Sequence, residues 1–276
     1  MKKLLFSVLA STLLVALAGC GSSSSQAPQN NAAPAASEEK KEQNLLEKVK
    51  ADGKILIGTE GTYAPFTFHD QSGKLTGYDV EVVTEVAKRI GVEPVFQETQ
   101  WDAMFAGLDS KRFDVVANQV GIRPDRQEKY DFSNAYTVST AVLVTHKDNT
   151  TVKGFEDIKG LKAAQTLTSN LTDIAKKNGA EIVGVEGFNQ AIDLLTSKRV
   201  DITINDGLSL LDFLKQKPDT PIKIVAKDPN VAKNGFLFRK GSTELVDSFN
   251  KALDDMTKDG TLAKISEKWF GADVSK

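Results

Sequence analysis

Two segments of the chain repeat one pattern at a constant spacing. WDAMFAGLDSKRFDVVANQ begins at Trp101, and FNQAIDLLTSKRVDITIND begins at Phe188, 87 residues later. In each segment apolar residues recur at helical spacing, SKR supplies cations that suit the negative pole of a helix, and a β-branched apolar run follows. The pattern predicts a helix and a buried strand twice, and therefore a chain of two similar halves. A chance origin of the short SKR match stays open as the alternative.

The two predicted strands are apolar without alternation, at residues 115–116 in the first half and 202–204 in the second. Strands of this kind between helices are typical of parallel sheets that are covered on both faces. With 276 residues, of which 40% are hydrophobic, the chain can form two cores of about 100 to 150 residues each. The sequence therefore predicts an α/β fold with two domains.

Polar side chains close both predicted strands. Asn118 and Gln119 end the first strand, and Asn205 and Asp206 end the second. In open α/β sheets, ligands bind outside the carboxyl ends of the strands. We therefore expect these four residues to line a cleft between two lobes. The alternative is that they only satisfy the backbone of turns, as Asn and Asp often do.

The N-terminus predicts export and lipid attachment. Lys2 and Lys3 precede an apolar run over residues 4–18 that is too short to span a bilayer as a stable helix, which is typical of a signal peptide. The run ends in LAGC, which is similar to the lipobox of bacterial lipoproteins, and Cys20 is the only cysteine of the chain. We expect residues 1–19 to be removed, Cys20 to carry a lipid, and residues 20–43 to form a flexible tether. An incidental thiol in a discarded signal peptide is the alternative.

Charge and motifs argue against several classes of protein. The formal net charge is −2, and loss of Lys2 and Lys3 makes it −4, so nucleic-acid binding is not expected. His69 and His146 have no cysteine or second histidine beside them, and no GxSxG, HExxH or phosphate-loop motif occurs. The sequence therefore favours a binding protein without metal or cofactor over an enzyme.

Five motifs carry a resemblance to a known family: GTEGTYAPFTF, GYDVEVVTEVAKRIG, SKRFDVVANQ, RPDRQEKYDFSNAYT and DGTLAKISEKWFG. Together they resemble an extracytoplasmic solute-binding protein of the polar amino acid family (family 3), the capture component of ABC importers. The resemblance covers residues 45–276. Within the family, WDAMFAGLDSKRFDVVANQV and KYDFSNAYTVS look most similar to cystine-binding members.

The resemblance implies a two-lobed, type II periplasmic-binding-protein-like fold, in which each lobe is a mostly parallel sheet flanked by helices. Residues 44–142 and 237–276 would form lobe 1, and residues 143–236 would form lobe 2. AVLVTH, near Ala141, and GFLFR, near Gly235, would be the two hinge strands that join the lobes.

The resemblance also implies two opposed charges for an amino acid ligand. Arg126 matches the family's arginine for the α-carboxylate, which a guanidinium holds through its planar fork. Asp206 matches the family's acceptor for the α-ammonium, a group that only donates hydrogen bonds. Each lobe would supply one charge, so that closure of the lobes is coupled to binding. An ion pair between Arg126 and Glu128 is the alternative.

Further ligand contacts follow from the same resemblance. Ser169 and Asn170 fall where the family uses a helix N-terminus as a second cradle for the carboxylate, although they also suit simple capping. Thr168 stands where glycine is common, and Gly121 stands where a hydroxyl residue often lies. These two departures change the hydrogen bonds that are expected there.

Aromatic and polar residues complete the predicted site. Tyr63, Phe66 and Trp101 match wall positions of the family, and Glu60 lies near them as a polar contact for the ligand side chain. Asn118 and Gln119 are further candidates. Core packing is the alternative for Phe66, whereas Trp101 is expected to face the cleft because it lies outside the apolar stripe of the helix that follows.

The resemblance implies a monomer that captures an amino acid, with L-cystine favoured, and delivers it to a membrane permease. It would work outside the cytoplasm, held at the cell membrane by the lipid on Cys20. Three alternatives remain: another polar amino acid as ligand, a dehydratase of prephenate-like acids on the same fold, and a sensor that docks a signalling membrane protein.

Overall fold

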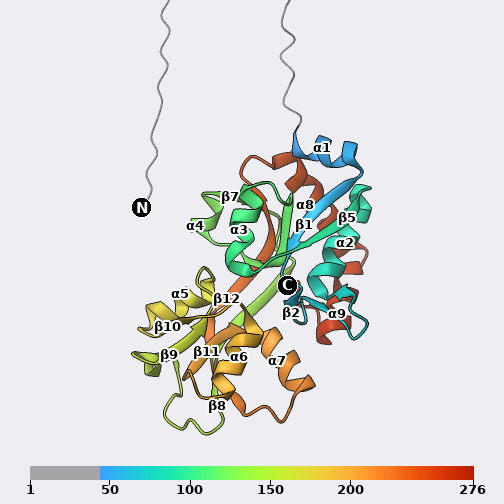
Figure 1. Ribbon diagram of the computed structural model, residues 1–276. Helices are drawn as coiled ribbons and strands as arrows, with labels where there is room; N and C mark the ends of the chain where they lie inside the picture. The colour runs from blue at the N-terminus through green and yellow to red at the C-terminus, as the bar shows by residue number, and fades with distance from the viewer. Residues whose placement is uncertain (1–43) are drawn as a thin grey trace, which may run out of the picture. The chain divides into compact units, whose positions relative to one another are not determined.

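The computed structural model describes residues 44–276 (Figure 1). The predicted signal peptide, Cys20 and the tether lie outside the described residues. The helices are α1 Leu45–Asp52, α2 Tyr78–Ile90, α3 Trp101–Asp109, α4 Pro124–Gln127, α5 Asn170–Lys177, α6 Phe188–Thr196, α7 Gly207–Gln216, α8 Thr243–Lys258 and α9 Thr261–Phe270, with a 3-10 turn at Phe155–Ile158. Every helix within this range is too short or too polar to cross a membrane.

The strands form one large sheet and one small sheet. They are β1 Lys54–Thr59, β2 Thr62–Tyr63, β3 Thr67–His69, β4 Leu75–Thr76, β5 Glu93–Glu98, β6 Val115–Gly121, β7 Tyr130–Phe132, β8 Thr137–His146, β9 Lys162–Gln165, β10 Glu181–Gly184, β11 Ile202–Asp206 and β12 Ile222–Arg239. The large sheet has the order β10-β9-β11-β8-β12-β6-β1-β5, with β7 paired to β12, and the small sheet has the order β2-β3-β4.

The two ends of the large sheet are parallel, as the sequence predicts. β1 pairs in parallel with β5 and β6, and β9 pairs in parallel with β10 and β11. Each of these strands is followed or preceded by a helix, so the connections are crossovers of the kind that parallel pairing requires.

The middle of the sheet consists of two long hinge strands. β8 and β12 pair with each other in antiparallel fashion, from Ile222 opposite His146 to Asn234 opposite Thr137, and they pair antiparallel with β11 and β6 on their other sides. The sheet is therefore mixed, because the chain crosses from one half to the other in β8 and returns in β12. Both hinge strands are longer than the segments predicted from AVLVTH and GFLFR.

A separate hydrophobic core lies on each side of the hinge strands. The first includes Ile55, Phe66 and Phe249, and it is extended by Met104 and Phe113 between α3 and the sheet. The second is built from residues of β9, β11, α5, α6 and α7. We call the first body lobe 1 (β1–β7, α1–α4, α8 and α9) and the second body lobe 2 (β9–β11 and α5–α7). They are the upper and lower parts of Figure 1.

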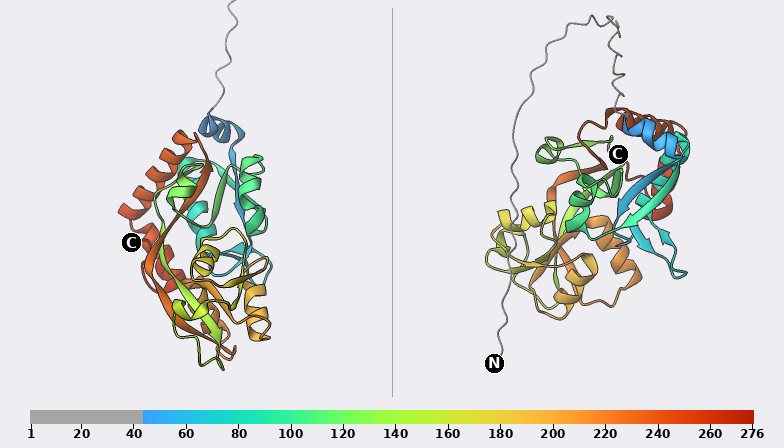
Figure 2. Two further views of the ribbon diagram at one scale, coloured as in Figure 1. Left: turned by 90° about the vertical axis from the view of Figure 1, so that its left-hand side faces the viewer. Right: turned by 45° about the horizontal axis from the view of Figure 1, so that its top comes forward.

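Lobe 1 contains both ends of the described chain. α8, drawn in red, packs beside α1, drawn in blue, in both views of Figure 2. The C-terminal helices therefore complete the lobe that α1 and β1 begin, and the hinge strands are the connection to lobe 2.

The SKR repeat forms the same helix cap in both lobes. Lys111 and Lys198 have left-handed backbones, with φ of 61° and 57°. The backbone N–H of Arg112 donates to Gly107 (2.9 Å), and that of Arg199 donates to Leu194 (2.9 Å). This is the Schellman arrangement, in which a left-handed residue ends a helix. The cations of SKR thus lie just beyond the helix rather than in its last turn.

Candidate functional site

A cavity of about 80 Å³ lies between the lobes, and we call it the main cavity. Its lining comes from both lobes and from both hinge strands: Glu60, Tyr63, Trp101, Asn118, Gln119, Ala141, Thr166, Ser169, Asn170, Leu171, Gly187, Phe188, Asn205, Asp206, Ala232 and Asn234. The four polar residues of the repeat therefore meet at one cavity, as the sequence predicts. Phe66, Gly121 and Arg126 are the predicted site residues that do not line it.

Arg126 is a buried cation behind the cavity wall. It is 7% exposed, its Nη1 donates to the carbonyl oxygen of Gly121 (3.1 Å), and its Nη2 donates to that of Thr168 (3.4 Å). Its Cζ lies 5.6 Å from the ring centroid of Trp101. Burial lowers the pKa of Arg126 to about 10, so the guanidinium is still charged at neutral pH.

No carboxylate within residues 44–276 forms a salt bridge with Arg126, whereas neighbouring Arg123 pairs with Asp125 and Asp173. The alternative ion pair of Arg126 with Glu128 is absent from this part of the chain. A buried charge without a counter-ion is unfavourable. The Arg126 guanidinium is therefore able to bind an anion.

Asp206 presents the opposite charge from lobe 2. It is the N-cap of α7, where its Oδ1 accepts from the backbone N–H of Leu208 (2.9 Å), and its Oδ2 accepts from the hydroxyl of Ser139. Burial raises the pKa of Asp206. No cation of the described chain forms a salt bridge with it. A carboxylate offers about four lone-pair sites, so acceptor capacity remains toward the cavity.

Glu60 is a second carboxylate of the cavity, held by Asn118. Asn118 donates from Nδ2 to Glu60 Oε2 (2.5 Å), and its Oδ1 accepts from the backbone N–H of Glu60 (2.8 Å). Burial raises the pKa of Glu60 to about 7, and the Asn118 hydrogen bond opposes this shift only in part. Asn118 thus satisfies a backbone group, as the alternative expects, and it also lines the cavity.

The aromatic residues divide between cavity and core. Tyr63 lines the cavity, and its hydroxyl donates to Asn205 Oδ1 in lobe 2 (2.7 Å). Trp101, the first residue of α3, also lines it; it is 6% exposed, and its Nε1 has no hydrogen-bond partner within residues 44–276. Phe66 is fully buried in the lobe 1 core, with its ring centroid 5.3 Å from that of Tyr63. Phe66 therefore supports the wall from behind, which is the core-packing alternative.

The N-terminus of α5 faces the cavity from lobe 2. Ser169 is its N-cap and accepts from the backbone N–H of Thr172 (3.2 Å), and Asn170 is its first residue. A β-carbon placed on Gly121 would lie 3.6 Å from Arg126 Nη1 and 3.8 Å from Asn170 Cγ. Gly121 therefore lies next to both the guanidinium and the start of this helix.

Three residues that the sequence did not single out belong to this region. Ser139 and Asn234 lie on the hinge strands, and Asp79 is a fully buried acid in the first turn of α2. The only signal for Asp79 is a carboxylate next to the apolar stripe of GYDVEVV. Ser139 and Asn234 give no signal, because either face of a strand can carry polar residues.

The chemistry of the cavity is that of opposed charges and amide groups. Asp206 lines the cavity and Arg126 lies beside the lining residue Trp101; neither forms a salt bridge within residues 44–276, and Asn118, Gln119, Asn205 and Asn234 add donors and acceptors to the lining. Across residues 44–276 no three histidine or acidic side chains converge in a way that could hold a metal ion. The arrangement is suited to holding a small zwitterion.

Known proteins of similar sequence agree with this chemistry. The L-cystine-binding protein TcyA of Bacillus subtilis (strain 168) is 51% identical over 277 residues, which cover all of both chains. The structure of the L-cystine solute receptor of Neisseria gonorrhoeae in the unliganded open conformation is 49% identical, covers 84% of this chain and 99% of the receptor, and has a TM-score of 0.57. An ancestral arginine-binding protein bound to arginine is 37% identical, covers 79% and 99%, and has a TM-score of 0.75.

A family model decides the membership. The model of bacterial extracellular solute-binding proteins, family 3, matches residues 55–272, which include lobe 2, both hinge strands and lobe 1 except for α1 and the first residue of β1. The chain therefore belongs to the bacterial extracellular solute-binding proteins of family 3.

Proposed function

We propose that the chain captures an amino acid between its lobes, with the α-carboxylate on Arg126 and the α-ammonium on Asp206. The observation that carries the proposal is a pair of charges that form no salt bridge within residues 44–276: the Asp206 carboxylate of lobe 2, which lines the main cavity, and the Arg126 guanidinium of lobe 1, which lies beside the lining residue Trp101. A zwitterion supplies the missing counter-ion to each. Ser169 and Asn170 add backbone N–H groups of the α5 N-terminus to the carboxylate side.

L-Cystine is the ligand that we favour. TcyA and the gonococcal receptor carry cystine in their names, and they are the more identical of the relatives described above. The cavity also holds a second carboxylate, Glu60, whose burial raises its pKa to about 7. A second ammonium in the ligand would stabilise the ionised form of Glu60. Cystine and lysine have such a group, and the guanidinium of arginine carries the same charge.

The size of the cleft also supports a long ligand. A second cavity of about 240 Å³ shares Glu60, Gly187 and Phe188 with the main cavity and adds the amide side chains of Asn189 and Gln190. We propose that the distal head group of cystine enters this second cavity. Its ammonium would approach Glu60, and its carboxylate would approach the amides at the start of α6.

A thermal-shift panel of the common amino acids tests the proposal. A ligand at about 100 times its dissociation constant raises the free energy of unfolding by about 2.7 kcal/mol, which is easily seen as a shift in Tm. We expect L-cystine to give the largest shift, followed by other polar amino acids. A shift with lysine or arginine and none with cystine would contradict the choice of ligand, and no shift with any amino acid would contradict the function itself.

We also propose that the protein is a lipoprotein that serves a membrane permease. LAGC supports cleavage before Cys20 and lipid on its sulfur, with residues 20–43 as the tether of a monomer. Cys20→Ser should move the protein from the membrane fraction to the soluble fraction. Loss of amino acid uptake on deletion of the chain would favour transport, whereas normal uptake would favour a sensor.

The lobe boundaries and the absence of catalysis are part of the same proposal. We place residues 44–142 and 237–276 in lobe 1 and residues 143–236 in lobe 2. We propose that no reaction takes place, because the cavity presents binding groups on both sides and the Ser139 hydroxyl, which is hydrogen-bonded to Asp206, does not line it. Formation of an aromatic product from prephenate-like acids would contradict this part.

A further inference from the structure

A chain of side-chain hydrogen bonds crosses both hinge strands, with Asn234 at its centre. Asn234 lies in β12 and lines the main cavity. Its Nδ2 donates to Gln119 Oε1 in β6 (2.9 Å) and to the hydroxyl of Ser139 in β8 (3.4 Å). The two hydrogens of this amide are thus shared between the two strands that flank β12.

Each arm of the chain ends at a carboxylate. On one side Ser139 donates its hydroxyl to Asp206 Oδ2. On the other side Gln119 donates from Nε2 to Asp79 Oδ1 (2.6 Å) and from its backbone N–H to Asp79 Oδ2 (2.8 Å). The chain therefore runs from the start of α2 in lobe 1 to the start of α7 in lobe 2.

The direction of the bonds fixes the residue type at position 234. Both arms begin with a hydrogen of the Asn234 amide and end on an acceptor that has no hydrogen of its own when ionised. An aspartate at 234 would lack both donors and would add a third negative charge between two carboxylates. Asn234 is only 4% exposed, Ser139 7%, Gln119 9% and Asp79 0%. Water therefore has little access to replace a lost bond, and a buried polar network of this kind is rigid when complete.

The same chain holds an unusual backbone conformation. Gln119 has φ of 49°, which is uncommon for a residue other than glycine and unfavourable unless its surroundings fix it. The Asp79 carboxylate accepts hydrogen bonds from the backbone N–H and the side-chain amide of Gln119, and Asn234 donates one to the side-chain oxygen of Gln119. Gln119 is thereby held where it lines the same cavity as Asp206.

We propose that Asn234 is a positioning residue for ligand binding, which orients Asp206 through Ser139 and fixes Gln119 through its side chain. The hinge strands then connect the lobes and also fix the position of Asp206, the ammonium acceptor of lobe 2, relative to Gln119 in the cavity wall of lobe 1. The role in binding rests on the proposed function, which names the ligand, whereas the hydrogen bonds of the chain do not depend on any ligand.

Calorimetry with conservative variants tests the role in binding. The probe is L-cystine, or the amino acid that gives the largest thermal shift if cystine gives none. Asn234→Asp and Ser139→Ala should each weaken binding by about tenfold or more, because each breaks a buried hydrogen bond on the way to Asp206. Asn230→Asp, an exposed position on the same strand, is the matched control and should stay within about twofold of the wild type. Asn234→Asp and Ser139→Ala binding as tightly as the control would overturn the proposal.

A spectroscopic measurement decides the proposal without a ligand. In the full chain with ¹⁵N-labelled Asn and Gln, Asp206→Asn should shift the side-chain amide signals of Asn234 and Gln119, two and three links away. Asp228→Asn, whose carboxylate accepts hydrogen bonds from Asn230 on the same strand, should leave both signals in place. An unmoved Gln119 signal in Asp206→Asn would overturn the chain. If the wild type binds no amino acid, the proposed function fails while this second result still decides the inference.

Discussion

Asp102 of lobe 1 and Thr168 of lobe 2 are joined by two hydrogen bonds across the cleft. The Asp102 carboxylate accepts from the backbone N–H of Thr168 (2.9 Å) and from its hydroxyl (2.7 Å), and a third bond comes from the backbone N–H of Leu167 (3.0 Å). The Thr168 hydroxyl therefore adds a side-chain contact between the lobes to the two backbone contacts.

This contact predicts that Asp102 stabilises the closed arrangement. Asp102→Ala should remove about 1 to 2 kcal/mol from closure, because the three bonds are exposed to solvent, and should therefore weaken amino acid binding by about 5-fold to 30-fold. Thr168→Val removes only the hydroxyl bond and should have a smaller effect. Asp109→Ala, at the other end of α3, contacts Tyr130 of its own lobe and should bind as the wild type does.

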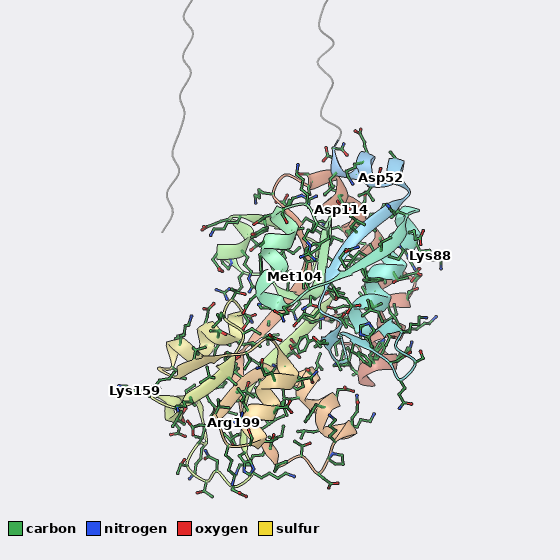
Figure 3. The ribbon with its side chains drawn as sticks, in the orientation of Figure 1. Asp52, Lys88, Met104, Asp114, Lys159 and Arg199 are labelled. Carbon is green, nitrogen blue, oxygen red and sulfur yellow. The ribbon has the colours of Figure 1, made fainter. Side chains whose placement is uncertain are left out.

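The distance between the lobes provides the measurement for Asp102. Lys88 in lobe 1 and Arg199 in lobe 2 are exposed (Figure 3), and spin labels on cysteines at these two positions report closure once Cys20 is replaced by serine. With ligand at a fixed concentration, Asp102→Ala should show a larger open fraction than Asp109→Ala. Equal open fractions in the two variants would contradict a role in closure.

Glu60 predicts that binding depends on pH. Because the pKa of Glu60 is raised to about 7, the side chain is mostly neutral near pH 6 and mostly ionised near pH 8. A ligand with a second ammonium binds the ionised form, whose fraction rises about tenfold from pH 6 to pH 8, so its affinity should rise by up to about tenfold over this range. Glu60→Gln should bind more weakly and lose this dependence, whereas Glu93→Gln, on the exposed edge of β5, should keep it. Calorimetry at several pH values makes the comparison, and an unchanged slope in Glu60→Gln would contradict the assignment.

Asp79 predicts a pH dependence of stability in the unliganded protein. Its burial raises its pKa from the ordinary value of 3.8 to about 7 in the folded state. Between these values the folded chain binds a proton that the unfolded chain has lost. The free energy of unfolding should therefore fall as the pH rises through this range, by at most about 1.4 kcal/mol per pH unit for one group.

Urea denaturation from about pH 4.5 to pH 8 checks this prediction. Asp79→Asn cannot titrate at this position, so its stability should fall less steeply with pH than that of the wild type, even if the variant is less stable throughout. Asp228→Asn, at a half-buried site on β12, should keep the wild-type slope. A wild-type slope in Asp79→Asn would show that the carboxylate is ionised in the folded protein.

Much of the arrangement follows from the sequence because local rules decide it. The repeat predicts two α/β halves, and the Schellman caps at Lys111 and Lys198 explain why SKR recurs where a helix must stop. The polar residues that follow the apolar runs of two strands meet at one cavity, as Asn118 and Asp206 show, but only β11 ends at its polar pair, because β6 continues past Asn118 and Gln119 to Gly121. These features depend on periodicity and on strand direction, which a single sequence carries.

Other features depend on packing between distant parts of the chain. Phe66 is core rather than cavity wall because Phe270, from α9 at the far end of the chain, packs 5.8 Å from it between ring centroids. Asp102 becomes an interlobe acceptor only through the way the lobes face each other. Ser139 and Asn234 become a hydrogen-bonded pair only because the register of β8 on β12 places them together. No local pattern determines such contacts.

The substitution Gly121→Ser should add a contact to the ligand. A β-carbon at this position would meet only ordinary contacts, the nearest being Arg126 Nη1 at 3.6 Å, so Gly121→Ser should change the free energy of unfolding by less than about 0.5 kcal/mol. Its hydroxyl would lie beside the proposed carboxylate position and should tighten binding by about twofold to tenfold. By contrast, a β-carbon at Gly107 would lie 2.5 Å from the Phe113 ring, so Gly107→Ala should destabilise the fold by about 1 to 3 kcal/mol. Denaturation and calorimetry on the two variants give the comparison; weaker binding by Gly121→Ser would contradict the placement of the carboxylate.

The proposed pair of Arg126 and Asp206 is tested most directly by calorimetry with L-cystine on single substitutions at each side. Arg126→Ala and Asp206→Asn should each weaken binding by about 2 to 5 kcal/mol, or about 30-fold or more, and Arg126→Lys should recover little because lysine lacks the planar fork. Arg112→Ala, an exposed arginine of the SKR cap, should bind as the wild type does. A loss of less than about tenfold in both Arg126→Ala and Asp206→Asn would contradict the account of a zwitterion held by one charge from each lobe.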